Sequence, residues 1–488
     1  MSAALVILAL FFLLALGLGI AGRRGKEMDL EQWSVGGRGF GSLIVFLLLA
    51  GEIYTTFTFL GASGYSYKNG GAAYYILCYG ALAYVISYWL APAIWRYGQS
   101  KRLLSQPDWF ISKYNSRMLG TVVAILGVIA MVPYLELQLK GLGIIVQETS
   151  YGRVSATAAV WIGALGLAAY VTISGIHAAA TNAIVKDVLV LIVVIAIGIY
   201  LPIHTSGSIE AMLQAVNAKA PGHLVLSKPA FDPGWFITSV LLSALGFFMW
   251  PHYFSAIYSS KDQKTFRRNA ALLPIYQLVL LFVIFVGFTA FLVTPGLANG
   301  DLSLLAISRS QLPSWAVGFI GAAGMLCALV PGAMLLTTCA TLIAQNVLKP
   351  LAPSLSGQRL SLVARAFVPI IALVALYLVF NGGDAIVNLL LLGYAFVTQL
   401  FPSMVLSLLR RNPVSAIGAA AGMVVGAAIV TWLTIGKLTT GDVLPFLPSG
   451  LHHLNVGMVA LVANVIVMAI VSAVTGGPAR AREVRPAT

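Results

Sequence analysis

One carboxylate lies in a stretch that is otherwise soluble in lipid. The segment Phe46–Tyr67 reads FLLLAGEIYTTFTFLGASGYSY and places Glu52 among apolar residues, with glycines and a row of hydroxyl side chains after it. A carboxylate near the middle of a membrane helix costs about 2.5–3.5 kcal/mol to insert, so it normally faces a bundle interior or a wet cavity and has a partner. We therefore expect function in this segment. The alternative is a carboxyl group that is simply protonated or hydrogen-bonded between helices.

A second stretch also carries residues that interrupt a membrane helix. Ser243–His252 reads SALGFFMWPH. Gly246 can unwind a helix there, and Pro251 lacks the N–H that would donate the usual backbone hydrogen bond. Gly51 offers the same freedom next to Glu52. In secondary transporters, discontinuous helices free backbone groups that bind substrate and coupling ion near the membrane midplane. We therefore predict two broken helices that share one binding site.

The composition places both stretches in a membrane. The chain of 488 residues is 59% hydrophobic and only 9% charged. Its apolar runs are longer than a soluble core helix needs, so the predicted fold class is an all-α, polytopic membrane protein. The three cysteines lie in apolar runs, without a disulfide or metal-ligand spacing. Because the sequence also shows no nucleophile elbow or phosphate loop, we expect no enzyme activity, no metal and no cofactor.

The apolar runs predict the number of membrane spans. About 20 apolar residues cross the hydrocarbon region of a bilayer, and on that rule the sequence predicts thirteen spans. They are Ala3–Ala21, Leu43–Ala62, Ala72–Trp95, Leu119–Val146, Ala156–Ile173, Ala179–Leu201, Trp235–Tyr258, Ala270–Val293, Trp315–Leu348, Leu360–Phe380, Ala385–Leu409, Val414–Gly436 and Val456–Val474. The two predicted breaks fall in the second and seventh spans. An inverted five-plus-five repeat would put them face to face.

The basic residues predict the orientation, because loops rich in Lys and Arg remain in the cytoplasm. With the N-terminus outside, most of the 29 Lys and Arg residues fall in cytoplasmic loops and the C-terminal tail. The outside loops hold Lys68, Arg153, Lys219, Lys228, Arg309 and Lys437. We therefore interpret the net charge of +14 as a topology signal and an attraction to anionic lipid, with no nucleic-acid partner. The expected location is a bacterial cytoplasmic (inner) membrane, crossed many times, with the C-terminus in the cytoplasm.

Several sequence blocks together resemble one family. The blocks are FLGASGYSY after the first break, QPDWFISKYNSRMLG before the fourth span, VPYLELQLKG within it, GIHAAATNAIV opening the sixth, and WPHYFSAIYSSKDQKTFRRN at the second break. They resemble the sodium/solute symporters, which share the LeuT-like inverted-repeat fold, and the resemblance covers nearly the whole chain. VPYLELQLKG, WPHYFSAIY and ALVPGAMLL look most like the bacterial monocarboxylate permease branch. That likeness implies lactate, pyruvate and related short carboxylates as substrates.

The resemblance also implies the organisation of the chain. Residues 1–488 would form a single transmembrane transporter domain. Its implied parts are an extra N-terminal helix and loop (1–37), the first inverted repeat (38–203), the second inverted repeat (235–409), two C-terminal helices (410–475) and a tail (476–488).

The resemblance implies a sodium site from which this chain departs. The family's conserved site combines backbone carbonyls of the first core helix with two hydroxyl side chains of the eighth. The carbonyl positions fall on Gly51 and Tyr54. The hydroxyl positions fall on Val330 and Pro331, which offer no side-chain oxygen. Asn182 stands where relatives carry an aspartate. We therefore expect the usual sodium to be absent.

A lysine offers a replacement for the missing sodium. Lys186 lies four residues after Asn182, on the same helix face, so its ammonium could occupy or approach the sodium position. Burial disfavours the charged form of a lysine, so Lys186 could bind and release a proton during transport. With Glu52, these residues form the candidate coupling-ion or proton site. In the alternatives, Lys186 pairs permanently with Asp187 or extends to the cytoplasmic face, or a shifted alignment supplies hydroxyls from Thr337, Thr338 and Thr341.

A short carboxylate needs hydrogen-bond donors and the positive end of a helix. The candidate substrate-binding residues are Tyr54, Thr55, Thr56, Thr58, Gln138, Trp250 and His252. We expect a secondary active transporter that imports a small organic anion by alternating access, coupled to a proton or independent of sodium. The alternatives are a sodium-coupled symporter of another small organic solute and, from another class, a channel or membrane sensor domain.

Overall fold

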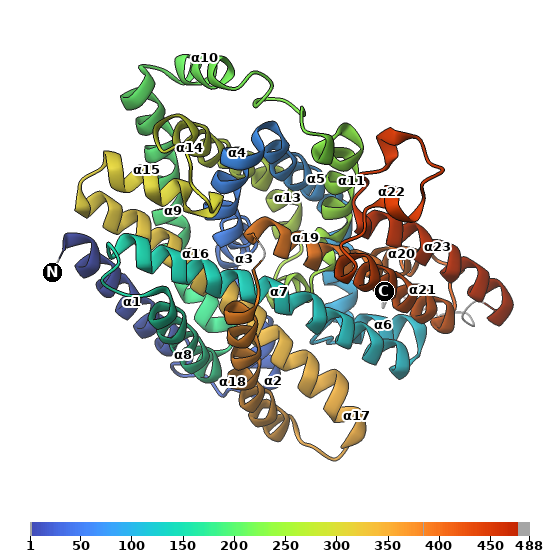
Figure 1. Cartoon of the computed structure of the whole chain (residues 1–488). Coiled ribbons are helices and arrows are strands. Elements are labelled where there is room, and N and C mark those ends of the chain that lie inside the picture. The colour runs from blue at the N-terminus through green and yellow to red at the C-terminus, as the bar shows by residue number, and fades with distance from the viewer. Residues whose placement is uncertain (1, 384, 477–488) are drawn as a thin grey trace.

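The computed structural model describes residues 2–383 and 385–476, and its helices stand together in one bundle (Figure 1). Within the described residues the β-structure is limited to an isolated bridge between Phe40 and Ser260. The longer helices are α1 (Ala3–Ala21), α3 (Ser42–Gly51), α5 (Tyr75–Ser100), α7 (Arg117–Thr149), α8 (Ala156–Ser174), α9 (Ile176–Ser206), α10 (Ile209–Lys219), α11 (Pro233–Gly246), α13 (Lys264–Leu278), α14 (Leu280–Val293), α16 (Ser314–Leu342), α18 (Gly357–Asn381), α19 (Ile386–Val397), α21 (Ala416–Ile435) and α23 (Val456–Thr475). The shorter ones are α2 (Leu30–Val35), α4 (Ala62–Asn69), α6 (Gln106–Tyr114), α12 (Pro251–Ser259), α15 (Ser303–Gln311), α17 (Lys349–Leu351), α20 (Phe401–Leu406) and α22 (Thr440–Val443). The tail predicted over 476–488 lies, apart from Gly476, outside the described residues.

The membrane class is confirmed, but the predicted count of thirteen spans is not. Eleven helices of the described chain are long and apolar enough to cross a membrane, or twelve if the bent pair Pro233–Met249 and Pro251–Ser259 is one span. The difference arises at the first break. There α3 has only ten residues, and the half-helix beyond it continues through a short turn into α5, so Phe57–Ser100 forms one long candidate.

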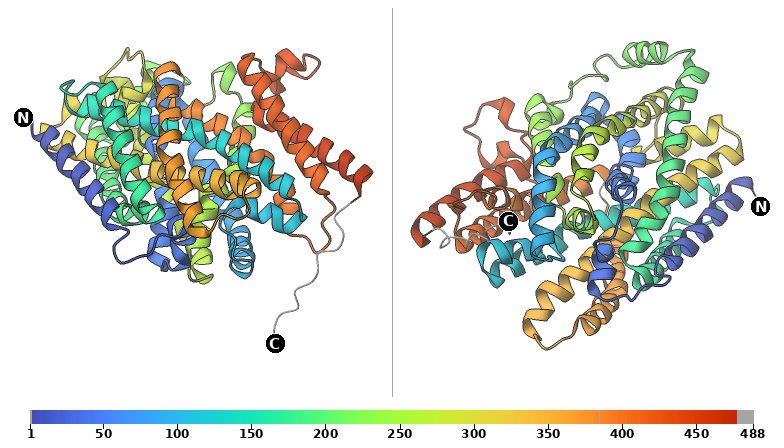
Figure 2. Two further views of the ribbon diagram at one scale, coloured as in Figure 1. Left: turned by 90° about the horizontal axis from the view of Figure 1, so that it is seen from below. Right: turned by 180° about the vertical axis from the view of Figure 1, so that it is seen from behind.

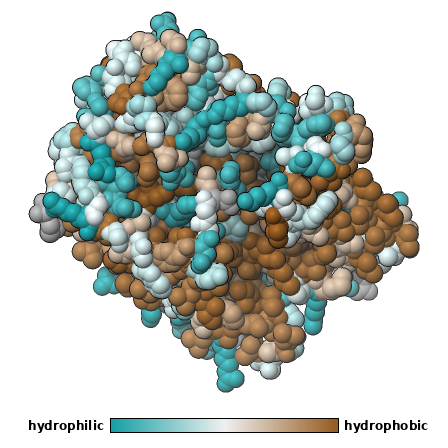
Figure 3. Space-filling view, viewed as in Figure 1, coloured by the Kyte–Doolittle hydropathy of each residue, from teal (hydrophilic) through white to brown (hydrophobic). Residues whose placement is uncertain are grey.

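The outer surface of the bundle is suited to lipid. Large apolar side chains such as Leu373 and Tyr377 of α18, Trp432 of α21 and Ile466 of α23 are exposed. Figure 3 shows apolar residues covering much of the side on which α18, α21 and α23 lie. Such extended apolar area on a folded chain marks a surface that meets lipid or another protein.

One helix occupies the centre of the bundle. Nearly every residue of α16 is buried, and α16 packs against α1, α7, α9 and α18. On the outside, α1 lies on one side of the bundle, and the paired helices α21 and α23 lie on the opposite side (Figure 2). The interior helices α3, α7, α9, α12 and α16 therefore bring their residues to a common buried region.

Both predicted helix breaks are present. The first begins after Gly51, where residues 52–55 leave the helix before a π-helical turn, Phe57–Gly61, leads into α4. The second follows Gly246, where a 3₁₀ turn ends at Trp250 in extended conformation (φ −65°, ψ 129°). The residue before a proline disfavours the helical region, whereas proline suits the first position of a helix. This is why α12 starts at Pro251, bent by 48° from the preceding half.

Candidate functional site at two helix breaks

The two breaks meet at a buried carboxylate. Glu52, the first residue after α3, has its Oε2 3.1 Å from Nε2 of His252, in the first turn of α12. The Tyr134 hydroxyl of α7 donates a hydrogen bond to the same Glu52 oxygen, at 3.3 Å. Of the side chains, 2% of Glu52 and 0% of His252 is exposed. The carboxylate that is unusual in the sequence therefore has partners, as an ionisable group within a membrane normally does.

The threonines after Glu52 stabilise the open backbone of the first break. The Thr58 hydroxyl donates to the Ile53 carbonyl at 2.6 Å and accepts from the Thr55 N–H at 3.0 Å. The Thr55 hydroxyl accepts from the Phe57 N–H at 3.2 Å. These bonds satisfy backbone groups that the interrupted helix leaves without partners. The hydroxyls of Thr55 and Thr58 therefore hold the shape of the break.

Thr56 and Gln138 connect the first break to α7. The Thr56 hydroxyl donates to Gln138 Oε1 at 2.6 Å, and the Thr56 N–H donates to the same oxygen at 3.3 Å. Gln138 is fully buried, and its Nε2 has no hydrogen-bond partner among the described residues. A buried amide with unused N–H donors next to an opened helix is a candidate contact for an anionic ligand.

A lysine ammonium lies directly on the first break. Lys186 of α9 is 0% exposed, and its Nζ donates to the carbonyl oxygens of Gly51 at 2.6 Å and Tyr54 at 3.1 Å. The Asp187 carboxylate lies 3.2 Å from Nζ at its Oδ1. An ammonium has three N–H donors, and three oxygen atoms surround this one. Lys186 therefore does not extend to the surface; it pairs with Asp187 and with the break at the same time.

The approach of the ammonium depends on a glycine. A Cβ atom on Gly51 would lie 3.0 Å from Lys186 Nζ, which is closer than ordinary van der Waals contact. The absence of a side chain at this residue lets the lysine reach the carbonyl group. Gly51 thus serves both as the end of α3 and as the access point for Lys186.

The α16 positions that the family resemblance assigns to sodium ligands are apolar. Val330 and Pro331 are buried in α16, one turn after Cys327, which interacts electrostatically with Lys186 and Asp187. The hydroxyls considered as displaced ligands are bonded elsewhere: the Thr337 hydroxyl donates to Ala333 and the Thr341 hydroxyl donates to Thr337, both within α16. Thr338 contacts Ser255 of α12 at 3.4 Å.

The remaining candidate residues divide between the site and its surroundings. Asn182 donates through Nδ2 to the Ala15 carbonyl of α1 at 3.0 Å, so it connects α9 to α1 rather than to the break. The Trp250 ring lies 5.0 Å from the Tyr134 ring and 5.4 Å from the Tyr394 ring. Trp250 thus forms an aromatic wall beside His252. The Tyr54 hydroxyl, in contrast, donates to the Tyr276 carbonyl at 3.3 Å.

Sequence reasoning did not identify two members of the site. Tyr134 bonds Glu52 and stands four residues before Gln138, one turn earlier on the same face of α7. That spacing was a usable signal. Tyr394 of α19, which packs on Trp250, has no comparable signal, because its position depends on how α19 packs against a helix that is distant in the chain.

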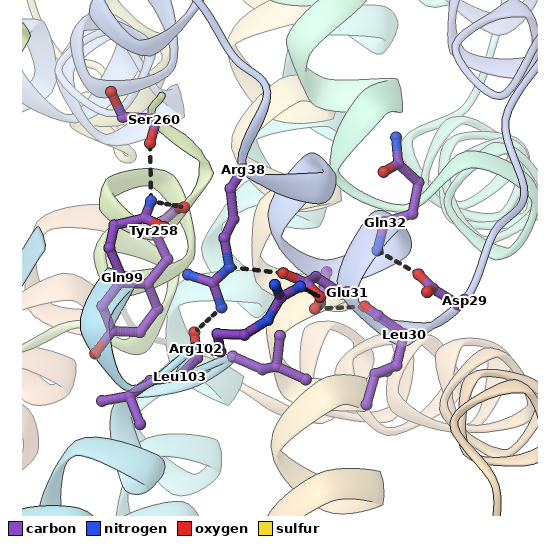
Figure 4. Close-up of polar contacts among 12 residues, drawn as sticks. Asp29, Leu30, Glu31, Gln32, Arg38, Gln99, Arg102, Leu103, Tyr258 and Ser260 are labelled. Carbon is purple, nitrogen blue, oxygen red and sulfur yellow. Dashed lines mark hydrogen bonds and ion pairs between the residues drawn. The ribbon is translucent and has the colours of Figure 1, made fainter. Parts of the chain in front are cut away.

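Glu31 of α2, Arg38 and Arg102 form a polar cluster in which the two arginine side chains point toward the Glu31 carboxylate (Figure 4). Glu31 accepts from Arg38 Nε at 2.6 Å and from Arg102 at 2.7 Å, and Arg38 also donates to the Leu103 carbonyl at 2.7 Å. Burial disfavours the Glu31 carboxylate, but the hydrogen bonds and charges of the two guanidinium groups outweigh burial and hold the pKa of Glu31 below its ordinary value.

Hydrogen bonds to backbone carbonyls connect the residues next to this cluster to the second broken helix. Gln99, near the end of α5, donates to the Ser260 carbonyl at 2.9 Å (Figure 4). The Phe40 N–H donates to the Ser259 carbonyl at 3.0 Å, and the Lys261 N–H donates to the Phe40 carbonyl at 3.1 Å. The segment before α3 and the end of α5 are therefore both hydrogen-bonded to residues at the end of α12.

Comparisons with known proteins agree with this architecture. A chain of Bacillus subtilis called uncharacterized symporter YhjB is 53% identical over 477 residues, covering 97% of this chain and 98% of that one. The monocarboxylate transport permease protein of Rhizobium johnstonii is 29% identical over 488 residues, covering 98% of each. A solved structure of a Na⁺-coupled sialic acid symporter superposes with a TM-score of 0.77 at 14% identity, covering 99% of each chain. That likeness shows a common fold.

A family model also matches this chain. The model of the sodium:solute symporter family matches residues 33–426, which include both breaks, Lys186 and α16. Together with the high identity to a symporter over almost the full length, this match shows that the chain belongs to the sodium:solute symporter family.

Proposed function

We propose that this protein is a sodium-independent, proton-coupled transporter that imports a small monocarboxylate by alternating access. The observation that carries the proposal is the Lys186 ammonium, which contacts the carbonyl oxygens of Gly51 and Tyr54. The family resemblance assigns these two carbonyl positions to a sodium ion. A tethered positive charge would therefore take the place of a mobile cation.

The surroundings of Lys186 support this replacement. Sodium needs several oxygen ligands, and the buried side chains of Val330 and Pro331 offer none. The Asp187 carboxylate balances the lysine charge at 3.2 Å. An ion that entered this place would have to displace an ammonium that already has three oxygen neighbours, so the site favours the lysine over sodium.

A short carboxylate suits the donors near the two breaks. Gln138 Nε2 and His252 Nδ1 are buried and lack hydrogen-bond partners among the described residues. A carboxylate has two oxygen atoms that accept such bonds. The relative named as a monocarboxylate transport permease aligns over 98% of this chain. A small organic anion of this class, bound beside Trp250, is the substrate that we infer.

The transport proposal includes a topology. We propose thirteen crossings, with the two halves of each broken helix counted together, in a bacterial cytoplasmic membrane. The distribution of Lys and Arg puts the N-terminus outside, so the Glu31 cluster lies on the cytoplasmic side. The repeats 38–203 and 235–409 would move relative to each other around the two breaks.

Uptake into proteoliposomes tests the substrate class. The purified protein should accumulate labelled pyruvate when the outside is more acidic than the inside, and unlabelled lactate should compete with it. Unlabelled proline at the same concentration should leave the uptake unchanged. Uptake that proline suppresses and lactate does not would contradict the monocarboxylate assignment.

A further inference from the structure

Glu52 and His252 form a contact in which a side chain from each break meets the other. Their Oε2 and Nε2 atoms lie 3.1 Å apart, and their side chains are 2% and 0% exposed. Glu52 directly follows α3, and His252 is the second residue of α12. Any movement that separates the two broken helices must therefore change this pair.

The pair has the chemistry of a shared proton site. Histidine is the side chain that ordinarily changes charge near physiological pH, and an interacting imidazole and carboxylate gain and lose protons as a unit. With one exchangeable proton the pair has no net charge, and without it the pair carries one negative charge. Lys186, in contrast, already donates to the carbonyl oxygens of Gly51 and Tyr54 and lies 3.2 Å from Asp187 Oδ1.

Other titratable groups face this pair from the surrounding helices. Those that interact electrostatically with Glu52 are Tyr84 of α5, Tyr134 of α7, Asp187 of α9 and Tyr253 of α12. Tyrosine hydroxyls remain neutral far above physiological pH, and Asp187 is paired with Lys186. Glu52 and His252 are therefore the titratable pair that joins the two breaks, and the proton that they hold sets the charge of this contact.

We propose that Glu52 and His252 form the proton site of the transporter, and that a carboxylate substrate binds beside them only while the pair holds its proton. The inference rests on the proposed function, because the substrate must be an anion. The unpartnered His252 Nδ1 and Gln138 Nε2 are the donors available to the carboxylate. A deprotonated pair would place a negative charge next to the bound anion and repel it.

This arrangement couples the two solutes without a covalent step. A proton from the outside water binds to the pair, the anion binds next, and both are released together when the breaks open to the cytoplasm. Binding of the anion then requires uptake of one proton. By linkage, the affinity for the anion should fall about tenfold for each pH unit once the pair begins to lose its proton.

The proposal is tested by equilibrium binding of labelled pyruvate to the purified full-length protein between pH 5.5 and pH 8.5. Proton uptake is followed in the same samples with an indicator dye. Wild type should show the tenfold loss per pH unit and take up about one proton per pyruvate. Glu52→Gln should bind pyruvate with an affinity that does not depend on pH and without proton uptake. His252→Gln, which keeps a polar side chain but removes the imidazole, should also lose the pH dependence. Glu210→Gln, at an exposed residue of α10, is the matched control and should behave as wild type.

The outcomes separate this inference from the proposed function. A wild-type pH slope retained in Glu52→Gln or His252→Gln would overturn the proton site. If the slope is lost as expected but transport also requires a sodium gradient, the proton site stands and the sodium-independent mechanism fails. If pyruvate binds at no pH, both the substrate class and its link to the pair are overturned.

Discussion

Replacement of Lys186 by methionine should lower the free energy of unfolding by about 3–5 kcal/mol, the usual cost of removing one partner of a buried ion pair. Methionine has a similar length but no N–H donor. The Asp187 carboxylate would lose the charge 3.2 Å away, and the carbonyl groups of Gly51 and Tyr54 would lose their donor. The first break would then lack its connection to α9, and we expect the initial rate of uptake to fall at least about tenfold, equivalent to about 1.4 kcal/mol.

A double-mutant cycle measures this interaction directly. Unfolding of Lys186→Met, Asp187→Asn and the double variant would be followed in mixed micelles at pH 7.5. Asp187→Asn alone should cost less than Lys186→Met, because the ammonium keeps two carbonyl acceptors. The double variant should be more stable than Lys186→Met, with a coupling of about 1–3 kcal/mol, because no uncompensated carboxylate remains. Additive effects together with unchanged uptake in Lys186→Met would refute the tethered-cation reasoning.

Three further changes probe other parts of the site. Gly51→Ala should slow uptake several-fold, because its Cβ would lie 3.0 Å from Lys186 Nζ, whereas Gly17→Ala, with no atom within 4 Å, should not. Glu31→Gln should weaken the contact between α2 and the loop after α5 by about 1 kcal/mol, or fivefold in population, measured as faster labelling of a cysteine introduced next to Glu31. The lowered pKa of Glu31 means that its contribution is present at neutral pH and is lost only as the pH falls through that pKa, so the effect should be equal at pH 6 and pH 8. Gln138→Leu should raise the KM for pyruvate about tenfold, because it removes the unpaired amide donors, while Gln214→Leu in the exposed part of α10 should leave KM unchanged.

The polarity of Glu52 in an apolar run was enough to locate the candidate site. It did not identify the residues that contact Glu52. Glu52 is conspicuous in the sequence because ionisable groups are costly in a membrane. Its contact with His252 joins two segments that are distant in the chain, and no local pattern encodes which residues of the two breaks meet. The breaks themselves were predictable, because Gly51, Gly246 and Pro251 act through local backbone chemistry.

Spacing along a helix gave an incomplete account of α9. Asn182 and Lys186 are four residues apart, yet Asn182 bonds α1 and Lys186 bonds the first break. A helix inside a bundle contacts several neighbours, and a shared face does not determine which neighbour each long side chain reaches. The span count is not confirmed for a related reason: the ten-residue α3 is too short to count as a crossing by itself, and the half-helix beyond the break runs on into α5.

The identity of the driving ion distinguishes a tethered cation from a mobile cation at the first break. Labelled pyruvate uptake should be measured in proteoliposomes with an inward proton gradient in sodium-free buffer and, separately, with an inward sodium gradient at equal pH, with the membrane potential clamped. The occupation of the Gly51 and Tyr54 carbonyls by Lys186 predicts accumulation with the proton gradient alone and no added effect of sodium. Accumulation that requires the sodium gradient would contradict it.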